Sequence, residues 1–466
     1  MGGIFVILSP QYQLLTLILM STLPANKLST EKIGKLIWEY SVPSIVGMVV
    51  MSVYNIIDRI FIGQGVGALA ISGLALTFPF MILLQAFGML IGAGAASRIS
   101  INLGENKTAR AEKVLGNALT LTAIISGSIA LIAFLMMDYL LTLFGGTDLT
   151  IGYARDYMQI IIPGSVLSAT LYGFNNIMRA SGFPRKAMYT MIIGAVVNVI
   201  LDPLFIFVFK WGIQGAAIAT VISFVVGAWW VLAHFTLPES HIKFRKENFK
   251  LDKDIVYSII NIGMSPFSMQ IATSIVVILI NGTLLRHGGD LAIGAYGIVN
   301  SLATLVIMVV LGLNQGTQPI VGFNFGAKQY DRMFRTVKLA IITGTILTTT
   351  GFLLGMFFSD LSVSLFTTDD ELTAIAANAL RISILLFPVV GFQIVISNFF
   401  QSIGKAKVSI FLSLTRQFIF LIPAILILPP VFGLNGAWAA MPVSDGLATL
   451  TAGYTFYRFY KTFKWL

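Results

Sequence analysis

The sequence of 466 residues contains no cysteine, so it offers neither a disulfide framework nor a thiolate metal site. Charged residues are also scarce, at 11% of the chain, whereas hydrophobic residues are 56% and the mean hydropathy is +0.87. A soluble protein of this length needs a polar surface that this composition cannot supply. The composition therefore indicates a membrane protein.

Familiar catalytic motifs are missing as well. The chain has no P-loop, no HExxH and no GxSxG, so we expect neither ATP-driven transport nor an intramembrane enzyme, and no organic cofactor. Only three histidines occur, and His234, His241 and His287 all fall at or near the ends of apolar runs. We expect them to be solvated loop residues rather than metal ligands.

The apolar residues form long runs, and about 20 such residues are enough for a helix to cross a bilayer. Runs this uniform do not show the period of two that barrel strands require. The expected spans are 36–62, 68–97, 114–137, 157–179, 187–209, 213–236, 256–285, 291–319, 336–358, 378–402, 408–430 and 433–457.

The net charge of +10 is placed as in a membrane protein and not as in a nucleic-acid-binding protein. Loops rich in Lys and Arg alternate along the chain with loops that have few of either, which is the positive-inside pattern. This alternation predicts an even number of spans with both termini in the cytoplasm. We expect the cytoplasmic (inner) membrane of a bacterium or archaeon.

The chain divides near its middle, at the basic segment PESHIKFRKENFKLDKD (238–254). We expect an N-terminal lobe over 31–237, a cytoplasmic linker over 238–255 and a C-terminal lobe over 256–466. Residues 1–30 are interpreted as an extension, because the apolar stretch at 3–23 is interrupted by polar residues and has no basic segment before it.

The two lobes repeat one another in sequence. LGENKTAR (103–110) is echoed by FGAKQYDR (325–332), and GIQGAAIA (212–219) by GLNGAWAA (433–440). Pro266 follows Pro43 by 223 residues, and Gly433 follows Gly212 by 221. Six spans per lobe give both copies the same orientation. The prediction is an all-α polytopic membrane protein of twelve transmembrane helices, in two six-helix lobes related by a parallel repeat around a central cleft.

Ionisable residues inside spans are costly and therefore mark candidate sites. The N-terminal lobe has Asp58 and Asp202, with Asn198 one turn before Asp202 on the same helix face and Thr220 on the next span. Carboxylate, amide and hydroxyl oxygens together suit a hard cation such as Na⁺. Two carboxylates close together in a low-dielectric interior could instead share a proton.

Two less interesting interpretations of Asp58 stay open at this point. It could pair with its neighbour Arg59, although adjacent helix positions do not face each other, or it could lie at the membrane interface. In the C-terminal lobe, Arg416 and Asp445 are expected near the midplane of consecutive helices, where we predict a buried ion pair. This pair could stabilise the lobe, or it could act in gating or substrate binding.

The spacing from Pro43 to Asp58, the NxxxDP motif at 198–203 and the segment NQGTQPIVGFNFGA (314–327) are similar to those of a known family. Over residues 30–460 the chain resembles the MATE (multidrug and toxic compound extrusion) transporters, in particular their DinF-like and MepA-like prokaryotic branch. Met51 departs from relatives that carry a polar residue at that position.

The resemblance implies that Asp58, Asn198, Asp202 and Thr220 line a cation site in the N-terminal lobe. It also implies export of amphipathic, often cationic, organic compounds against Na⁺ or H⁺ by alternating access. We expect a monomer in the lipid bilayer whose partners are small organic substrates, with no nucleic acid.

A flippase for lipid-linked or small-metabolite substrates is the alternative function. It is disfavoured because Arg416 is the chief basic residue found within the spans. A channel is disfavoured by the two-lobed repeat with its single acidic site.

Overall fold

The computed structural model describes residues 24–463 apart from 144–146 and 368, and the regular structure within them is helical. The helices of the first half are α2 (Pro24–Thr30), α3 (Ile33–Gly65), α4 (Ala68–Gly104), α5 (Thr108–Leu135), α6 (Met137–Leu143), α7 (Ile151–Ala180), α8 (Pro184–Pro203) with its π-helical continuation η1 (Leu204–Val208), and α9 (Gly212–His234). Those of the second half are the short 3₁₀-helix η2 (Lys246–Phe249), α10 (Lys253–Gly326), α11 (Tyr330–Phe357), α12 (Ser359–Ser364), α13 (Asp370–Ser383), α14 (Phe387–Ser402), α15 (Ala406–Leu414), the π-helix η3 (Thr415–Leu421) and α16 (Ile422–Phe463).

Twelve segments cross the bundle within the described residues. Nine helices are long and apolar enough to span a membrane, and one of them, Ala406–Phe463, holds two crossings because it breaks at Gly433. α7 adds a crossing, and α13 with α14, a pair bent by 55°, adds the twelfth. The predicted twelve-helix fold is therefore confirmed. The apolar stretch at 3–23 lies outside the described residues.

Two glycines make sharp turns possible inside continuous helical segments. Gly289 in α10 has φ 66° and Gly433 in α16 has φ 59°, a left-handed conformation that other residues adopt only with strain. Each glycine separates two antiparallel crossings. Helix α10 therefore contains two crossings, and α16 contains the end of one crossing and the whole of the next.

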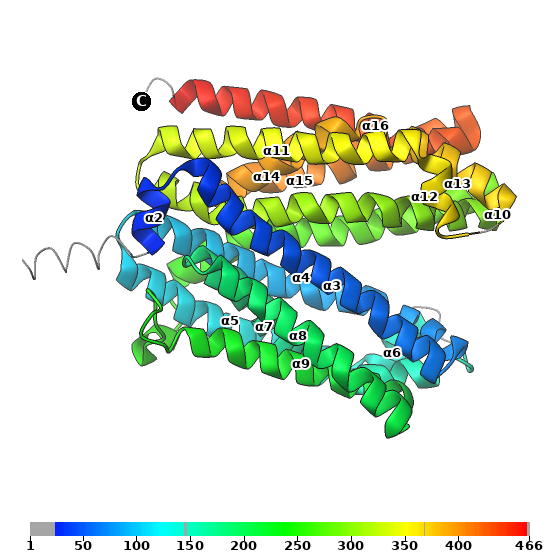
Figure 1. The fold of residues 1–466 in the computed structure, drawn as a ribbon, viewed down its shortest axis with the longest axis horizontal. Helices are drawn as coiled ribbons and strands as arrows, with labels where there is room; N and C mark the ends of the chain where they lie inside the picture. Colours follow the sequence, from blue (N-terminus) through cyan, green and yellow to red (C-terminus); the bar gives the residue numbers. More distant parts are fainter. Residues whose placement is uncertain (1–23, 144–146, 368, 464–466) are drawn as a thin grey trace, which may run out of the picture.

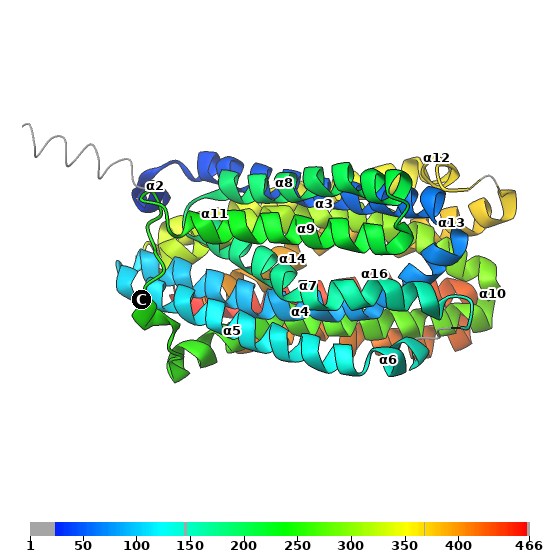
Figure 2. The same cartoon turned by 90° about the horizontal axis from the view of Figure 1, so that it is seen from below.

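Helices α3 to α9 form one lobe and α10 to α16 the other (Figure 1). The repeat extends to small features: the short helix α6 begins at Met137 and its counterpart α12 at Ser359, 222 residues later. Both lie at the same end of the bundle, whereas α2 and the end of α16 lie at the other (Figures 1 and 2). We call this other end the basic end, because the loops with Lys107, Lys186, Lys250 and Lys405 lie there.

The two lobes pack most closely in the half of the bundle toward the basic end. Gly94 of α4 lies against the backbone of Ile259 in α10, and Gly263 of α10 lies against the carbonyl of Leu90. Gly104 and Gly326 make similar backbone approaches near the ends of α4 and α10. Small residues of this kind allow helix backbones to come together in a membrane protein. Away from the basic end, the ribbons of α3 and α10 diverge (Figure 1).

Hydrogen bonds reinforce this packing between the lobes. Gln318 Nε2 donates to Ser97 Oγ at 2.7 Å, and Ser41 Oγ donates to the carbonyl of Leu313 at 3.3 Å. Helix α2 also joins the C-terminal lobe, since Arg332 Nη2 donates to the carbonyls of Leu28 and Glu31 at 3.1 and 2.7 Å. Residues 24–30 of the predicted extension therefore form a helix that contacts the C-terminal lobe.

We expect Gly263→Ala to destabilise the protein, because a Cβ atom at this position would collide with the carbonyl of Leu90. Overpacking of this kind costs about 1–3 kcal/mol. Gly282→Ala on the same crossing is the matched control: nothing lies within 4 Å of its Cβ position, and alanine is the better helix former by about 1 kcal/mol. Thermal unfolding in detergent should show a lower midpoint for Gly263→Ala only. Equal midpoints would show that the lobes do not meet closely at Gly263.

Candidate cation site and buried ion pair

The end of α8 brings two polar side chains to one buried face. Asn198 and Asp202 are one turn apart and both are fully buried. Pro203 ends the α-helix because it lacks a backbone N–H, and the chain continues as the π-helix η1. π-Helical turns are rare and occur frequently at functional sites.

Two further helices, α3 and α9, supply the rest of this cluster. Asn198 Nδ2 donates to Asp202 Oδ1 at 3.2 Å and to Thr220 Oγ1 of α9 at 3.3 Å. Asp58 of α3 is 8% exposed, and its carboxyl group lies within hydrogen-bonding reach of Asp202. The structure thus places all four residues selected from the sequence in one buried cluster.

Three oxygens of the cluster are buried without a hydrogen-bond partner among the described residues. They are Oδ1 of Asp58, Oδ1 of Asn198 and Oδ2 of Asp202. Unpaired acceptors in a dry interior are costly, so they attract a positively charged partner. Oxygens from carboxylates and an amide fit Na⁺, and the contact between the two carboxyl groups equally fits a shared proton.

The neighbour of Asp58 does not neutralise it. The guanidinium of Arg59 lies over the ring of Phe78, 4.6 Å from its centroid, and Arg59 is exposed. Asp58 itself is buried within the protein.

Two tyrosines lie near the cluster and a third lies next to one of them, and none of the three was predicted from the sequence. Tyr157 of α7 lies close to Thr220 and to both carboxylates, and Tyr54 of α3 lies close to Asp58 and to Tyr172 of α7. Tyr54 precedes Asp58 by one helical turn, which is a signal that could have selected it. The other two tyrosines approach only because α7 packs against α8 and α9.

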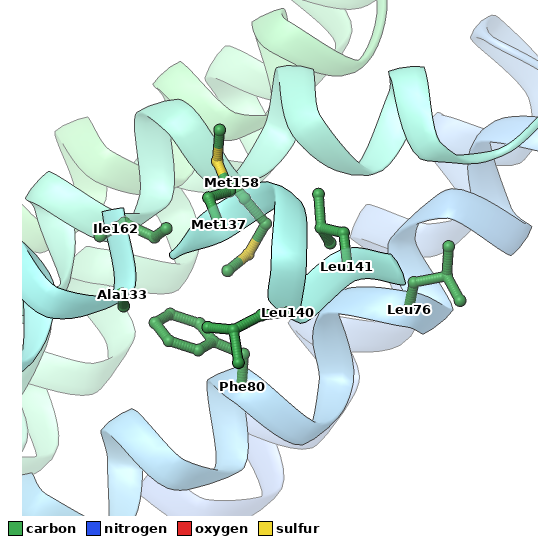
Figure 3. A pocket seen from close by; sticks show the side chains of 8 residues that line it. All are labelled: Leu76, Phe80, Ala133, Met137, Leu140, Leu141, Met158 and Ile162. Carbon is green, nitrogen blue, oxygen red and sulfur yellow. The ribbon is translucent and has the colours of Figure 1, made fainter. Parts of the chain in front are cut away.

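A small cavity nearby is unsuited to an ion. It lies between α4, α5, α6 and α7, and every side chain around it is apolar (Figure 3). Its lining residues are Leu76, Phe80, Ala133, Met137, Leu140, Leu141, Met158 and Ile162. We interpret it as a packing void beneath α6.

The C-terminal lobe holds a different charged group. Arg416 Nε donates to Asp445 Oδ1 at 2.5 Å, from the π-helix η3 to the second crossing of α16. The Arg416 side chain is 22% exposed and that of Asp445 is 4% exposed. The structure therefore pairs the two residues that the sequence analysis placed at a common depth.

A comparison with known families identifies this architecture. The family model described as MatE matches residues 43–204 and 261–426, one segment in each lobe. The chain belongs to the MatE family. This family consists of transporters, and the resemblance noted in the sequence is confirmed.

Known relatives of this MATE protein cover nearly its whole length. The multidrug export protein MepA of Staphylococcus haemolyticus is 24% identical over 425 residues, which are 91% of this chain and 93% of that protein. The solved structure of the MATE multidrug transporter DinF-BH in complex with rhodamine 6G is 39% identical, has a TM-score of 0.86 and covers 92% of this chain and 96% of its own. A multidrug resistance MATE transporter in its outward-facing conformation, 23% identical with a TM-score of 0.89, covers 94% of this chain and 98% of its own and shares the fold.

The MATE protein has a second buried arginine that the sequence analysis overlooked. Arg179, in the last turn of α7, is 5% exposed and joins the two lobes. It donates to Gln315 Oε1 of α10 at 2.5 Å, to Asn175 Oδ1 at 2.6 Å and to Asn176 Oδ1 at 3.4 Å. Its partners among the described residues are neutral amides. The expectation that Arg416 is the chief basic residue within the spans is therefore wrong, because Arg179 is buried as well. Its position near the end of an apolar run had suggested a solvated side chain.

The expectation of solvated histidines is wrong for His234. This residue ends α9 and is 2% exposed, with its ring 4.5 Å from that of Phe183 and 5.1 Å from that of Phe235. The segment between α9 and α10 folds back over it. A position at a helix end does not ensure exposure when the next loop packs onto the helix.

We expect Gln315→Leu to destabilise the MATE protein by about 2 kcal/mol or more, because it leaves the buried charge of Arg179 without its acceptor in the other lobe. The same change in an Arg179→Met background should cost less, since no buried charge is left. Denaturant unfolding of both single variants and the double variant measures this coupling. If Gln315→Leu lowered the free energy of unfolding equally in both backgrounds, this coupling would be contradicted. Arg381→Met, at an exposed ion pair, is the control.

Proposed function

We propose that this MATE protein is a secondary active exporter that exchanges Na⁺ or H⁺ for amphipathic, often cationic, organic compounds. The observation that carries the proposal is the buried cluster of Asp58, Asn198, Asp202 and Thr220, with its three unpartnered oxygens among the described residues. Such a cluster is stable only when a positive charge compensates the two carboxyl groups. A transported cation supplies that charge for part of each cycle.

The cluster couples the cation to the substrate through its charge. With Na⁺ or a proton bound, the negative charge of Asp58 and Asp202 is reduced, and an organic cation loses its electrostatic attraction to this lobe. When the cation leaves, the attraction returns. Each ligand therefore favours release of its competitor. A ligand shifts the equilibrium between the two lobe arrangements only by the difference in its affinity for them.

The packing of the lobes supports alternating access. The close glycine contacts and hydrogen bonds between the lobes lie toward the basic end, so this arrangement is closed on that side. Access from the basic end requires these contacts to open. The positive-inside rule assigns the basic end to the cytoplasm, which supports the cytoplasmic membrane as the location and a cytoplasmic side for both termini.

The substrate class rests on the relatives. MepA is a multidrug export protein, and DinF-BH was solved in complex with rhodamine 6G. By analogy, this chain takes chemically varied organic compounds of that size. The tyrosines around the cluster, Tyr54, Tyr157 and Tyr172, offer aromatic surface beside the carboxylates, which suits a flat organic cation.

Transport in proteoliposomes tests the proposal. The full chain is reconstituted with rhodamine 6G as probe, and a Na⁺ or a H⁺ gradient is imposed separately. We expect gradient-driven efflux in the wild type, and a loss of about 100-fold in Asp58→Asn and Asp202→Asn, because a neutral amide forfeits a charge-assisted interaction of about 2–3 kcal/mol with the cation.

The matched control is Asp138→Asn, which changes an exposed carboxylate paired with Arg155 at the end opposite the basic end. Its efflux should equal that of the wild type. Unaltered coupled efflux in both Asp58→Asn and Asp202→Asn would refute the proposed coupling site. The gradient that drives efflux identifies the ion.

A further inference from the structure

The guanidinium of Arg416 is only partly used by the protein. Its Nε donates to Asp445 Oδ1, but Nη1 and Nη2 have no hydrogen-bond partner in the part of the chain that the structure describes. Neither of these two nitrogens is a buried unsatisfied atom, and the side chain is 22% exposed. A structural ion pair normally engages the terminal nitrogens of arginine in two parallel hydrogen bonds. Here the terminal pair of donors stays free.

The contacts of Arg416 lie within the C-terminal lobe, with Asp445 and Tyr296. Ser409, Ser413 and Arg416 are spaced by one helical turn each, so they share a face, and both serines are buried against Ser265 of α10. Phe411, Phe418 and Ile419 of the same crossing are exposed. A guanidinium at this depth would not face lipid.

The surroundings of Arg416 are polar on one side and aromatic on another. Tyr296, on the second crossing of α10, lies close enough to Arg416 for electrostatic interaction and is buried. Gln417 is also buried, and its Nε2 is 3.5 Å from Thr273 Oγ1. Arg416 therefore has an aromatic and a polar neighbour within this lobe.

The chemistry of the free donors selects the ligand. Two parallel N–H groups match the two oxygens of a carboxylate, and such bidentate bonds are strong and directional. Asp445 already compensates the charge of Arg416, so an additional anion alone would leave a net negative charge in a low-dielectric site. A ligand that carries its own positive charge avoids this cost.

We propose that Arg416 binds the carboxylate of zwitterionic amphipathic substrates, compounds that combine an organic cation with a free carboxylate. The proposal rests on the proposed export function and names a substrate class for it. Asp445 positions the guanidinium through Nε and leaves the terminal nitrogens for the ligand. The N-terminal lobe then handles the coupling ion, and the C-terminal lobe recognises the acidic group of the substrate.

A matched pair of dyes tests this assignment. Tetramethylrhodamine carries a cationic ring system and a free carboxylate, and its methyl ester lacks only the negative charge. Binding to the full chain in detergent is measured by fluorescence anisotropy. We expect the wild type to bind the acid about tenfold more tightly than the ester, as one bidentate contact allows.

The decisive variant is Arg416→Gln/Asp445→Asn, which removes both charges and leaves no unpaired buried ion. It should bind the ester as the wild type does and lose the preference for the acid. Arg416→Lys, which keeps the charge without the planar donors, should keep only part of the preference. The control is Arg381→Gln/Asp360→Asn, which removes an exposed ion pair and should leave the preference intact.

Several outcomes would overturn the assignment: equal binding of acid and ester by the wild type, binding of neither dye, or a preference that survives in Arg416→Gln/Asp445→Asn. A failure of the export function appears in a different measurement, as the absence of gradient-driven efflux by the wild type in proteoliposomes. The acid preference is measured by binding in detergent, which needs no gradient. The two proposals therefore fail separately.

Discussion

A charge within the bilayer must be compensated inside the protein, because lipid cannot hydrogen-bond to it, and this constraint organises the interior of the bundle. The structure meets it in three ways. Arg416 is paired with Asp445. Arg179 is held by amide oxygens from both lobes. Asp58 and Asp202 keep unpartnered oxygens among the described residues, and theirs is the cluster for which we propose a bound cation.

The repeat builds similar lobes with different chemistry. Both lobes contain a short helix at the end opposite the basic end, α6 and α12, and both contain a π-helical segment, η1 and η3, on the corresponding crossing. One π-helix follows Asn198 and Asp202, whereas the other contains Arg416. Helix packing constrains small and apolar residues in both copies, whereas the charged residues differ between them. The acidic cluster therefore lies in the N-terminal lobe, and the pair of Arg416 and Asp445 lies in the C-terminal lobe.

Much of the fold could be predicted from the sequence, because a membrane span is a local property. A long apolar run must be helical, since the backbone must satisfy its own hydrogen bonds in lipid. The crossings and the twofold repeat followed from this rule and from the spacing of Pro43 and Pro266. The candidate residues Asp58 and Asp202 were found by the same logic, because acidic residues inside apolar runs are conspicuous.

The features that the sequence could not predict depend on which helices contact one another. The sequence by itself determined that this is a bundle of membrane-spanning helices in two similar halves, and it identified which residues carry rare charges. Only the tertiary structure decided that Tyr157 contacts Thr220, that Arg179 joins the lobes and that His234 is buried. It also decided that Arg416 meets Asp445 through Nε alone. Hydropathy averages over a helix, whereas these contacts depend on the rotation and crossing of each helix against its neighbours, which packing sets.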